Sequence, residues 1–388
     1  MRRGVATFTL DTGKCPKWLF ERMVKLGREM TEILIAEFGP DEFIRRIADP
    51  VWFQSLGTVL AFDWNASGLT TILTAALKEA IKGQEKYFGV FICGGKGKTS
   101  LRTPSQIYEW GDRLSLPNAH VQKLVYNSRM AAKVDSSLVQ DGFDLYHHSF
   151  FFSRKGSWAV VQQGMNAEKG RARRYHWSSD ELKDLIVEPH KGIVSDTFQK
   201  SVLNMTAEEA EKNRSLSVEM LTTSFTNIYK DLILLDKYSS SLGHMAKFQS
   251  KDGDQLTLLD LPGHEFHQHP VQNENFSRSH YLQKIIGKLC EYRPQNYQSL
   301  LATEGVGPKT VRALSLISEV IYGAKASYRD PARYSFAHGG KDATPYPVDR
   351  KTYDQSIHIL KKAVLKTRLS ATEKNNAVRR LLNRENKN

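Results

Sequence analysis

The sequence predicts a mixed α/β domain over residues 1–185, followed by an all-α domain over residues 195–360. Segments that resemble strands alternate with segments of helical periodicity as far as about residue 180, whereas helical periodicity alone remains from about residue 195. A basic helix or tail is predicted over residues 361–388. The length of 388 residues also favours two or three domains over one.

The first domain begins with an amphipathic helix over 17–38, which "GP" ends. The run "TVLAFDWN" at 58–65 predicts a buried strand, and a helix over 69–82 follows it. A second strand is predicted for "KYFGVFIC" at 86–93. Because a helix separates these two strands, the sequence predicts a β-α-β unit with parallel strands.

The next elements are a helix over 118–133 and two strands within 144–164. The strands flank the turn Arg154-Lys155-Gly156, so they predict a hairpin. In the second half, "TAEE" at 206–209 predicts a capped helix start, and 216–236 continues with helical periodicity.

The composition favours a globular protein that meets a polyanion. Hydrophobic residues make up 40% and charged residues 25%, the net charge is +13, and no run of eighteen apolar residues occurs. Nine Lys/Arg and two Glu give residues 361–388 a charge of +7, which suits a polyanion or equally a solvated tail. The N-terminus lacks the pattern of a secretion signal, and three scattered cysteines fit a reducing compartment, so we expect a cytoplasmic protein.

The stretch "TEGVGPKTVRAL" at 303–314 predicts an anion site at the start of a helix. Pro308 suits the first helical position, and Gly305 and Gly307 leave no side chain in front of their backbone N–H groups. Those groups and the helix dipole attract an anion, and Lys309 adds a full positive charge. A phosphate is the expected ligand.

With its flanking helices, residues 294–323 resemble the helix-hairpin-helix elements that bind DNA, whose hairpin carries a G-V-G-x-K-T type turn. The resemblance implies sequence-independent contacts to the sugar-phosphate backbone, because phosphate contacts do not read bases. An ordinary capped turn between core helices is the alternative. The contacts are expected from residues of the turn and the second helix: Gly305, Val306, Gly307, Lys309, Thr310 and Arg312.

Two further stretches could contact phosphates. "KGRARRYHW" at 169–177 interleaves basic and aromatic residues, which suits backbone tracking and base stacking, although a solvated loop explains it as well. "CGGKGKTS" predicts a phosphate nest at a strand end, with a plain glycine turn as the alternative, and a second Gly-Gly-Lys follows at 339–341. The residues concerned are Arg171, Arg173 and Arg174 for DNA, and Gly94, Gly95, Lys96, Lys98, Gly339, Gly340 and Lys341 for phosphate.

Carboxylates and imidazoles gather in residues 135–148 and suggest metal-assisted phosphodiester hydrolysis. Oxygen-rich ligands favour Mg²⁺ or Mn²⁺, and Asp144 and His147 are the expected ligands. Successive strand residues face opposite sides, so only one histidine of the pair can share a face with Asp144. The alternative is turn aspartates and partly buried histidines. The candidate catalytic residues are Asp135, Asp141, Asp144, His147 and His148.

Lys309 and Asp349 also resemble the catalytic pair of the helix-hairpin-helix DNA glycosylases, in which a hairpin lysine precedes an aspartate in a V-D context. The resemblance implies Lys309 as Schiff-base nucleophile and Asp349 as its partner. The connection between them is longer than that family's, and no four-cysteine iron–sulfur pattern follows.

Over nearly its full length the chain resembles the domain-of-unknown-function family numbered 763. The resemblance rests on "RRGVATFTLDTGKCPKWLFERM", "VQDGFDLYHHSFFF", "VVQQGMN" and "SYRDPARYSFAHGGKDATPYPV". It implies a cytoplasmic protein and no particular reaction. We therefore expect a metal-dependent DNA-repair nuclease that acts on bulges, flaps or junctions, because a hairpin blind to sequence must discriminate by shape. A non-enzymatic DNA-binding module and a glycosylase/lyase are the alternatives.

Overall fold

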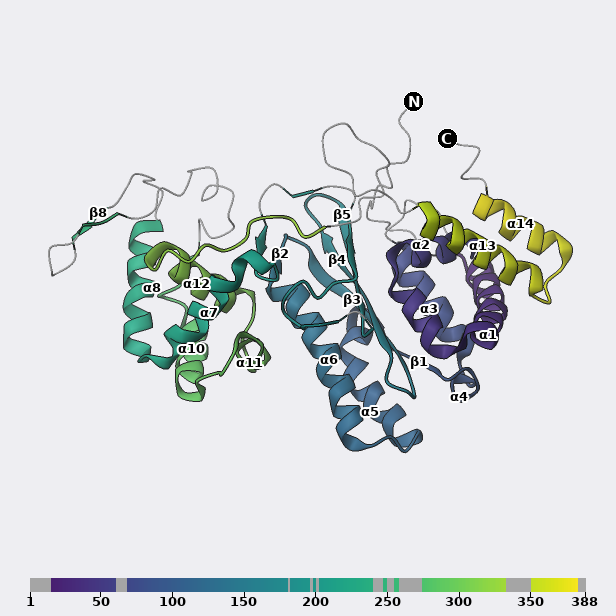
Figure 1. The fold of residues 1–388 in the computed structure, drawn as a ribbon, viewed down its shortest axis with the longest axis horizontal. Coiled ribbons are helices and arrows are strands. Elements are labelled where there is room, and N and C mark those ends of the chain that lie inside the picture. The colour runs from purple at the N-terminus through teal and green to yellow at the C-terminus, as the bar shows by residue number, and fades with distance from the viewer. Residues whose placement is uncertain are drawn as a thin grey trace, which may run out of the picture.

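The structure, a computed structural model, describes residues 15–60, 68–180, 182–195, 198–199, 202–239, 247–249, 255–257, 274–332 and 350–382. An antiparallel sheet stands at its centre (Figure 1). Helices α1–α3 lie on one side of the sheet together with α13 and α14, and α5 and α6 lie on the other. A further group of helices, α7, α8 and α10–α12, lies beyond α6. The predicted mixture of helices and strands is confirmed.

The sheet has the order β1-β3-β4-β5-β6, and every neighbouring pair is antiparallel. The predicted hairpin within 144–164 is confirmed as β3 and β4. Beside the sheet, the short strands β2 and β7 pair with each other. The strands are β1 (Val90–Lys96), β2 (Val139–Gln140), β3 (Asp144–Ser153), β4 (Trp158–Asn166), β5 (Arg171–Ser178), β6 (Gly192–Val194), β7 (Leu203–Asn204), β8 (Lys247–Gln249) and β9 (Gln255–Thr257).

The predicted parallel β-α-β unit is wrong. Thr58 and Val59, which should begin its first strand, end helix α2 (Pro50–Val59) instead, and β1 pairs antiparallel with β3. The helix forms because the Asp49 side chain accepts a hydrogen bond from the Trp52 N–H and a proline occupies the first helical position. That local start signal outweighs the apolar run that follows it.

Helix α1 extends beyond its predicted bounds, whereas α3 matches them. Helix α1 (Lys17–Ala48) continues past the predicted stop and bends there, because Gly39 has a φ of 82° and a proline follows it. Helix α3 (Gly68–Ile81) closely matches its prediction and is followed by Gly83 in a left-handed conformation. Their apolar faces pack on one face of the sheet, where Phe151 joins the same core.

The C-terminal helices α13 (Arg350–Lys366) and α14 (Ala371–Leu382) pack on the N-terminal helices α1 and α2. Leu360, Val364, Ala377 and Leu381 belong to the same hydrophobic core as α1 and α2. The part of 361–388 that the structure describes is therefore helical and packed, and most of its basic side chains are exposed, although the Arg380 guanidinium donates to the Val59 carbonyl over 2.9 Å. Lys362, for example, is an exposed ion-pair partner of Glu37.

The remaining helices form a second core that continues onto the α6 face of the sheet. The capping box predicted at 206–209 is absent, because the Thr206 hydroxyl donates to the Asn204 side chain and a 3-10 turn begins at Glu208. The bounds are α4 (Glu85–Phe88), η1 (Gly97–Arg102), α5 (Thr103–Arg113), α6 (Asn118–Ser137), η2 (Glu208–Ala210), α7 (Glu211–Glu219), η3 (Met220–Thr222), α8 (Phe225–Ser239), α10 (His280–Tyr292), α11 (Tyr297–Ala302), α12 (Pro308–Leu316) and η5 (Ile317–Ile321).

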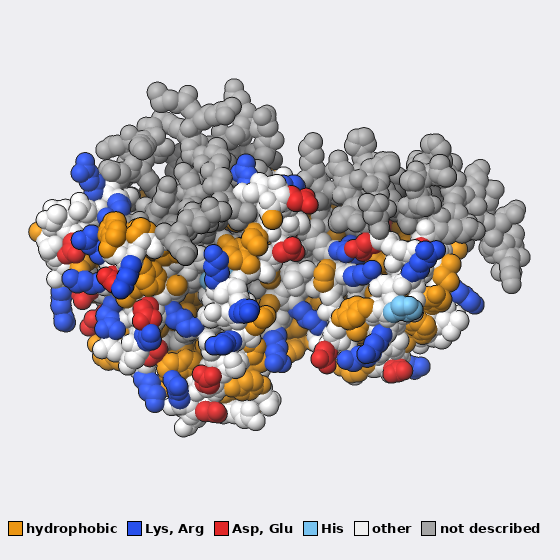
Figure 2. All heavy atoms as spheres, turned by 180° about the vertical axis from the view of Figure 1, so that it is seen from behind, with side chains coloured by type: hydrophobic (Ala, Val, Ile, Leu, Met, Phe, Trp, Pro, Cys, Tyr) orange, Lys and Arg blue, Asp and Glu red, His pale blue; other side chains and the backbone are white. Residues whose placement is uncertain are grey.

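Positive charge is distributed widely on the surface. On the face seen in Figure 2, lysine and arginine side chains are spread over the described surface and do not form one patch. The distribution of charge therefore does not locate a binding site, and the site has to be identified from local geometry. In the described parts of the chain, every helix is too short or too polar to cross a bilayer.

Candidate nucleic-acid interface

The stretch 303–307 forms a tight turn between α11 and α12. A capping box of Asn296 and Ser299 starts α11 at Tyr297, three residues after Pro294, where the predicted element begins. Gly307 is the N-cap residue of α12 and Pro308 occupies its first position, as predicted. Between the helices, Val306 is buried and its N–H donates to the Thr303 carbonyl over 3.2 Å. The buried valine anchors the turn in the hydrophobic core, and the two glycines on either side of it lie at the surface.

Gly305 is required by both backbone conformation and space. Its φ is +90°, a region that residues with a side chain rarely adopt, and a Cβ here would overlap the Ile285 side chain. The Tyr281 hydroxyl donates to the Gly305 carbonyl over 2.8 Å. Helix α10 therefore fixes the turn from one side.

The turn lies at the surface, as an anion site requires. Glu304 and Pro308 are exposed, and Gly305, Gly307 and Lys309 are half-buried. Among the hydrogen bonds of the described residues, the N–H groups of Gly305 and Gly307 have no acceptor. The Lys309 ammonium lies 5.9 Å from the ring centre of Phe276. The turn thus combines two open N–H groups with a helix N-terminus, and Lys309 is the second residue of that helix.

Helix α10 adds a basic stripe that the sequence reading did not identify. Tyr281, Lys284 and Lys288 are exposed at intervals of three and four residues, so they share one face. That face adjoins the turn, because the Lys288 ammonium donates to the Glu304 carbonyl over 3.3 Å. We call this surface, made of Tyr281, Lys284, Lys288, Gly305, Gly307 and Lys309, the turn surface.

Helix α6 supports the turn from behind. The Lys133 ammonium donates to the carbonyls of Leu301 and Thr303, both over 2.6 Å, and thereby caps the C-terminus of α11. The Gln140 side-chain amide donates to the Pro308 carbonyl over 3.0 Å. The turn is thus held to the sheet-bearing part of the molecule.

Two residues of this segment that were predicted to contact DNA make contacts within the protein instead. Thr310 is buried, and the Arg312 guanidinium forms an ion pair with Glu274 and donates to the Gln140 side chain over 2.7 Å. Both residues stabilise the start of α12 against its neighbours.

The predicted contacts of β5 require a correction. Arg173 and Arg174 are fully buried, so their guanidinium groups are out of reach of a DNA strand. Arg174 donates to the Gln54 side chain over 2.9 Å and to the His176 ring over 2.8 Å. Arg171, at the start of the strand, is half-buried.

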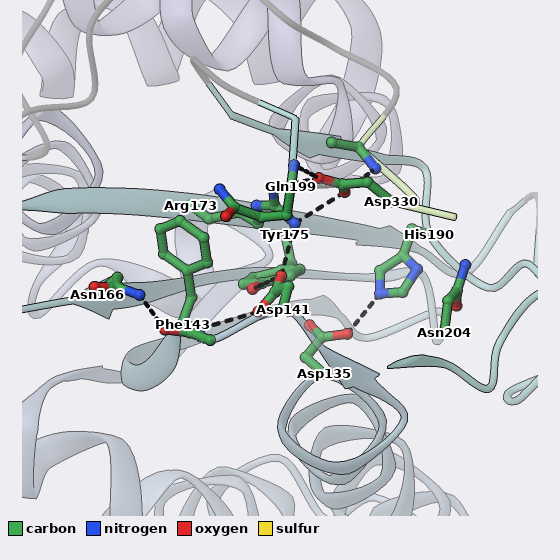
Figure 3. A network of polar contacts seen from close by, with 12 residues as sticks. Asp135, Asp141, Phe143, Asn166, Arg173, Tyr175, His190, Gln199, Asn204 and Asp330 are labelled. Carbon is green, nitrogen blue, oxygen red and sulfur yellow. Dashed lines mark hydrogen bonds and ion pairs between the residues drawn. The ribbon is translucent and has the colours of Figure 1, made fainter. Parts of the chain in front are cut away.

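Arg173 is the centre of a buried ion network (Figure 3). Its guanidinium contacts the Asp141 carboxylate at 2.8 Å and the Asp330 carboxylate at 2.7 Å. Burial opposes the charged form, but the two carboxylates raise the pKa of Arg173 well above its usual value. The Tyr175 hydroxyl donates to Asp141 over 2.7 Å. Asp141 is therefore a structural partner of an arginine.

A second buried network surrounds Asp135, which α6 presents to the same face of the sheet. One carboxylate oxygen lies 2.5 Å from the His190 Nε2 atom. The other accepts from the Gln162 side chain over 2.5 Å and from the Trp177 ring N–H over 3.1 Å. Gln162 also contacts the His148 ring at 2.8 Å, which links the second histidine of the predicted set to Asp135.

The predicted metal set is split between two faces of the sheet. His148 faces α6 and lies 2.9 Å from the Ser128 hydroxyl, whereas His147 faces α3 and lies 3.1 Å from the Thr74 hydroxyl. Asp144 is exposed at the start of β3. Within the described ranges, no three His, Cys, Asp or Glu side chains are arranged to hold a metal ion.

The buried histidines make stability depend on pH. Burial, with smaller contributions from His148 and Lys96, lowers the pKa of His147 from 6.5 to about 3. Between pH 6.5 and about pH 3, the unfolded chain therefore binds more protons than the folded one. The contribution of His147 to the free energy of unfolding is complete above pH 6.5 and is lost as pH falls toward 3. We expect acidification from pH 7 to pH 5 to cost about 2 kcal/mol through His147 alone.

Urea unfolding at a series of pH values measures this effect. His147→Gln should flatten the dependence, and His120→Gln on α6 serves as the matched control. If the free energy of unfolding depends on pH equally in the wild type and in His147→Gln, His147 is not the source of the effect.

The predicted phosphate nest is partly closed. The Gly94 N–H donates to the Gln106 side chain over 2.8 Å, and its carbonyl accepts from Lys78 over 2.9 Å. Gly95 is half-buried, while Lys96 and Lys98 are exposed beside it. The predicted residues Gly339, Gly340, Lys341 and Asp349 lie outside the described part of the chain.

A family model described as "Protein of unknown function (DUF763)" matches residues 4–348. No curated protein sequence and no solved structure matches the chain.

Proposed function

The chain belongs to the DUF763 family, whose description states no activity, and we propose that it binds DNA through the turn surface. The observation that carries the proposal is a surface turn that combines two open N–H groups with the N-terminus of α12, whose second residue is Lys309. A phosphate group satisfies all of these at once. Backbone contacts of this kind carry no base preference, so binding is independent of sequence.

The basic stripe on α10 favours a nucleic-acid strand over a single phosphate as the ligand. Lys284 and Lys288 extend the positive surface along the side of the turn, about 4.5 Å and about 10 Å along the helix from Tyr281. A polyanion can contact each of these in succession, and each contact releases counterions. Glu304, the exposed carboxylate at the rim, weakens this attraction locally.

Binding measured as a function of salt tests the proposal. We expect Lys309→Glu to weaken binding to unrelated DNA sequences about ten-fold or more at moderate salt and to reduce the salt slope by about one. Lys86→Glu, the same charge change on the exposed helix α4, is the control and should leave most of the affinity intact. Equal losses in the two variants would refute a localised site.

A second candidate function is metal-dependent hydrolysis of the bound strand. Asp144 is the exposed member of the predicted catalytic set, whose other members are buried, so it is the one that a DNA strand and a divalent ion can reach. The Asp135–His190 pair is almost fully excluded from solvent and stabilises the fold. A bound Mg²⁺ or Mn²⁺ would activate the attacking water and neutralise charge on the phosphate.

Labelled DNA carrying bulges, flaps or junctions tests this candidate, with Mg²⁺, Mn²⁺ or EDTA. Cleavage should stop with EDTA and fall at least about 100-fold in Asp144→Ala, with binding unchanged. Asp112→Ala, which removes an exposed carboxylate of α5, is the control. Cleavage that survives EDTA and is trapped on Lys309 by borohydride would instead support the lyase alternative. Intact DNA under all conditions would leave a binding module.

A further inference from the structure

We infer that the turn surface takes a strand with an unpaired base, such as single-stranded DNA or a frayed duplex end, and that Tyr281 stacks on this base. The inference rests on the proposed function and specifies its substrate. It starts from the Tyr281 side chain, which is 59% exposed although it is a large aromatic group.

Tyr281 is held in place despite its exposure. Its hydroxyl donates to the Gly305 carbonyl, and its helix turn is capped by Ser279, whose side chain accepts from the Leu282 N–H. The neighbouring Leu282 is fully buried. Because the ring is already ordered, a base that stacks on it costs little further entropy.

The ring also lies next to the proposed phosphate site. Tyr281 contacts the carbonyl of Gly305, and the N–H of the same residue is one of the open donors of the turn. A nucleotide whose phosphate occupies the turn therefore has an aromatic surface within reach of its base. Basic groups combined with an aromatic platform are what sequence-tolerant proteins use to hold single strands.

Continuous duplex cannot use this platform. Its bases stack on one another, so both faces of each base are covered except at an end, a gap or a bulge. Since stacking discriminates between exposed and covered bases but not among sequences, the turn surface would select DNA by structure.

The test compares Tyr281→Leu, which removes the ring, with Tyr281→Phe, which removes the hydroxyl alone. Tyr292→Leu is the matched control, since Tyr292 lies on the same helix, is 60% exposed and follows eleven residues later. The substrates are a single strand, a duplex with an overhang and a relaxed closed-circular duplex, which has neither ends nor loops. A 2-aminopurine base in the single strand reports stacking through quenched fluorescence.

Tyr281→Leu should lose about ten-fold or more in affinity for the single strand and the overhang, and little for the closed-circular duplex. Tyr281→Phe and Tyr292→Leu should retain binding and quenching. Equal losses in Tyr281→Leu and Tyr281→Phe on every substrate would mean that Tyr281 only braces the turn, and unquenched 2-aminopurine would also overturn the inference. If Lys309→Glu leaves binding unchanged, the proposed function itself fails, which is a separate outcome.

Discussion

Arg173→Met is expected to destabilise the protein by about 3–5 kcal/mol, because it leaves two carboxylates buried without their cation. Asp141 and Asp330 are almost fully excluded from solvent, and both contact the Arg173 guanidinium. Burial already raises the pKa of Asp141, and Arg173 is the main group that opposes this rise. In the variant, the Asp141 and Asp330 carboxylates should therefore take up protons near neutral pH, or the protein should unfold.

Thermal and urea unfolding measure this prediction, with Arg154→Met as the matched control. Arg154 is exposed in the turn between β3 and β4, so its substitution should change stability by less than about 0.5 kcal/mol. Asp330→Asn combined with Arg173→Met should recover part of the loss, since it removes one of the stranded charges. Wild-type stability of Arg173→Met would contradict the ion network.

Gly305→Ala is expected to cost about 2–4 kcal/mol of stability, from backbone strain at positive φ and overlap with Ile285. Gly307→Ala is its matched partner. Gly307 has an extended backbone, and a Cβ there meets no atom within 4 Å. We expect Gly307→Ala to fold normally but to bind DNA less tightly, because its methyl group stands beside the open N–H groups.

Unfolding and binding measurements on both variants separate structure from ligand contact. If Gly307→Ala binds like the wild type while Gly305→Ala is merely unstable, the glycines serve only the turn. That result would favour the alternative of an ordinary capped turn between core helices.

Local signals explain which parts of the fold were predictable. The hairpin of β3 and β4 and the start of α12 follow from short-range chemistry, namely a glycine turn and a proline at a helix start. The parallel β-α-β unit depended on assigning the apolar run at Thr58 to a strand. The preceding Asp49-Pro50 pair instead starts a helix, and strand direction is set by long-range pairing that no local pattern reveals.

The candidate site shows the same division. Gly305, Gly307 and Lys309 could be identified because they are consecutive in a recognisable turn. The role of Arg173 could not be identified from the sequence, because its partner Asp330 lies 157 residues away along the chain. His190 likewise reaches Asp135 across 55 residues. The α10 stripe carried a signal, the spacing of Tyr281, Lys284 and Lys288, but only the folded chain brings it beside the turn.

The most direct test observes the two glycine amides themselves. With glycine-selective ¹⁵N labelling, the chain gives at most 26 glycine amide signals, and Gly307→Ala assigns one of those in the turn. On titration with a single-stranded oligonucleotide, the signals of Gly305 and Gly307 should shift downfield and saturate, while that of Gly156 in the β3–β4 turn stays in place. Saturable binding that leaves both turn amides unshifted would contradict the proposal that they hold a phosphate.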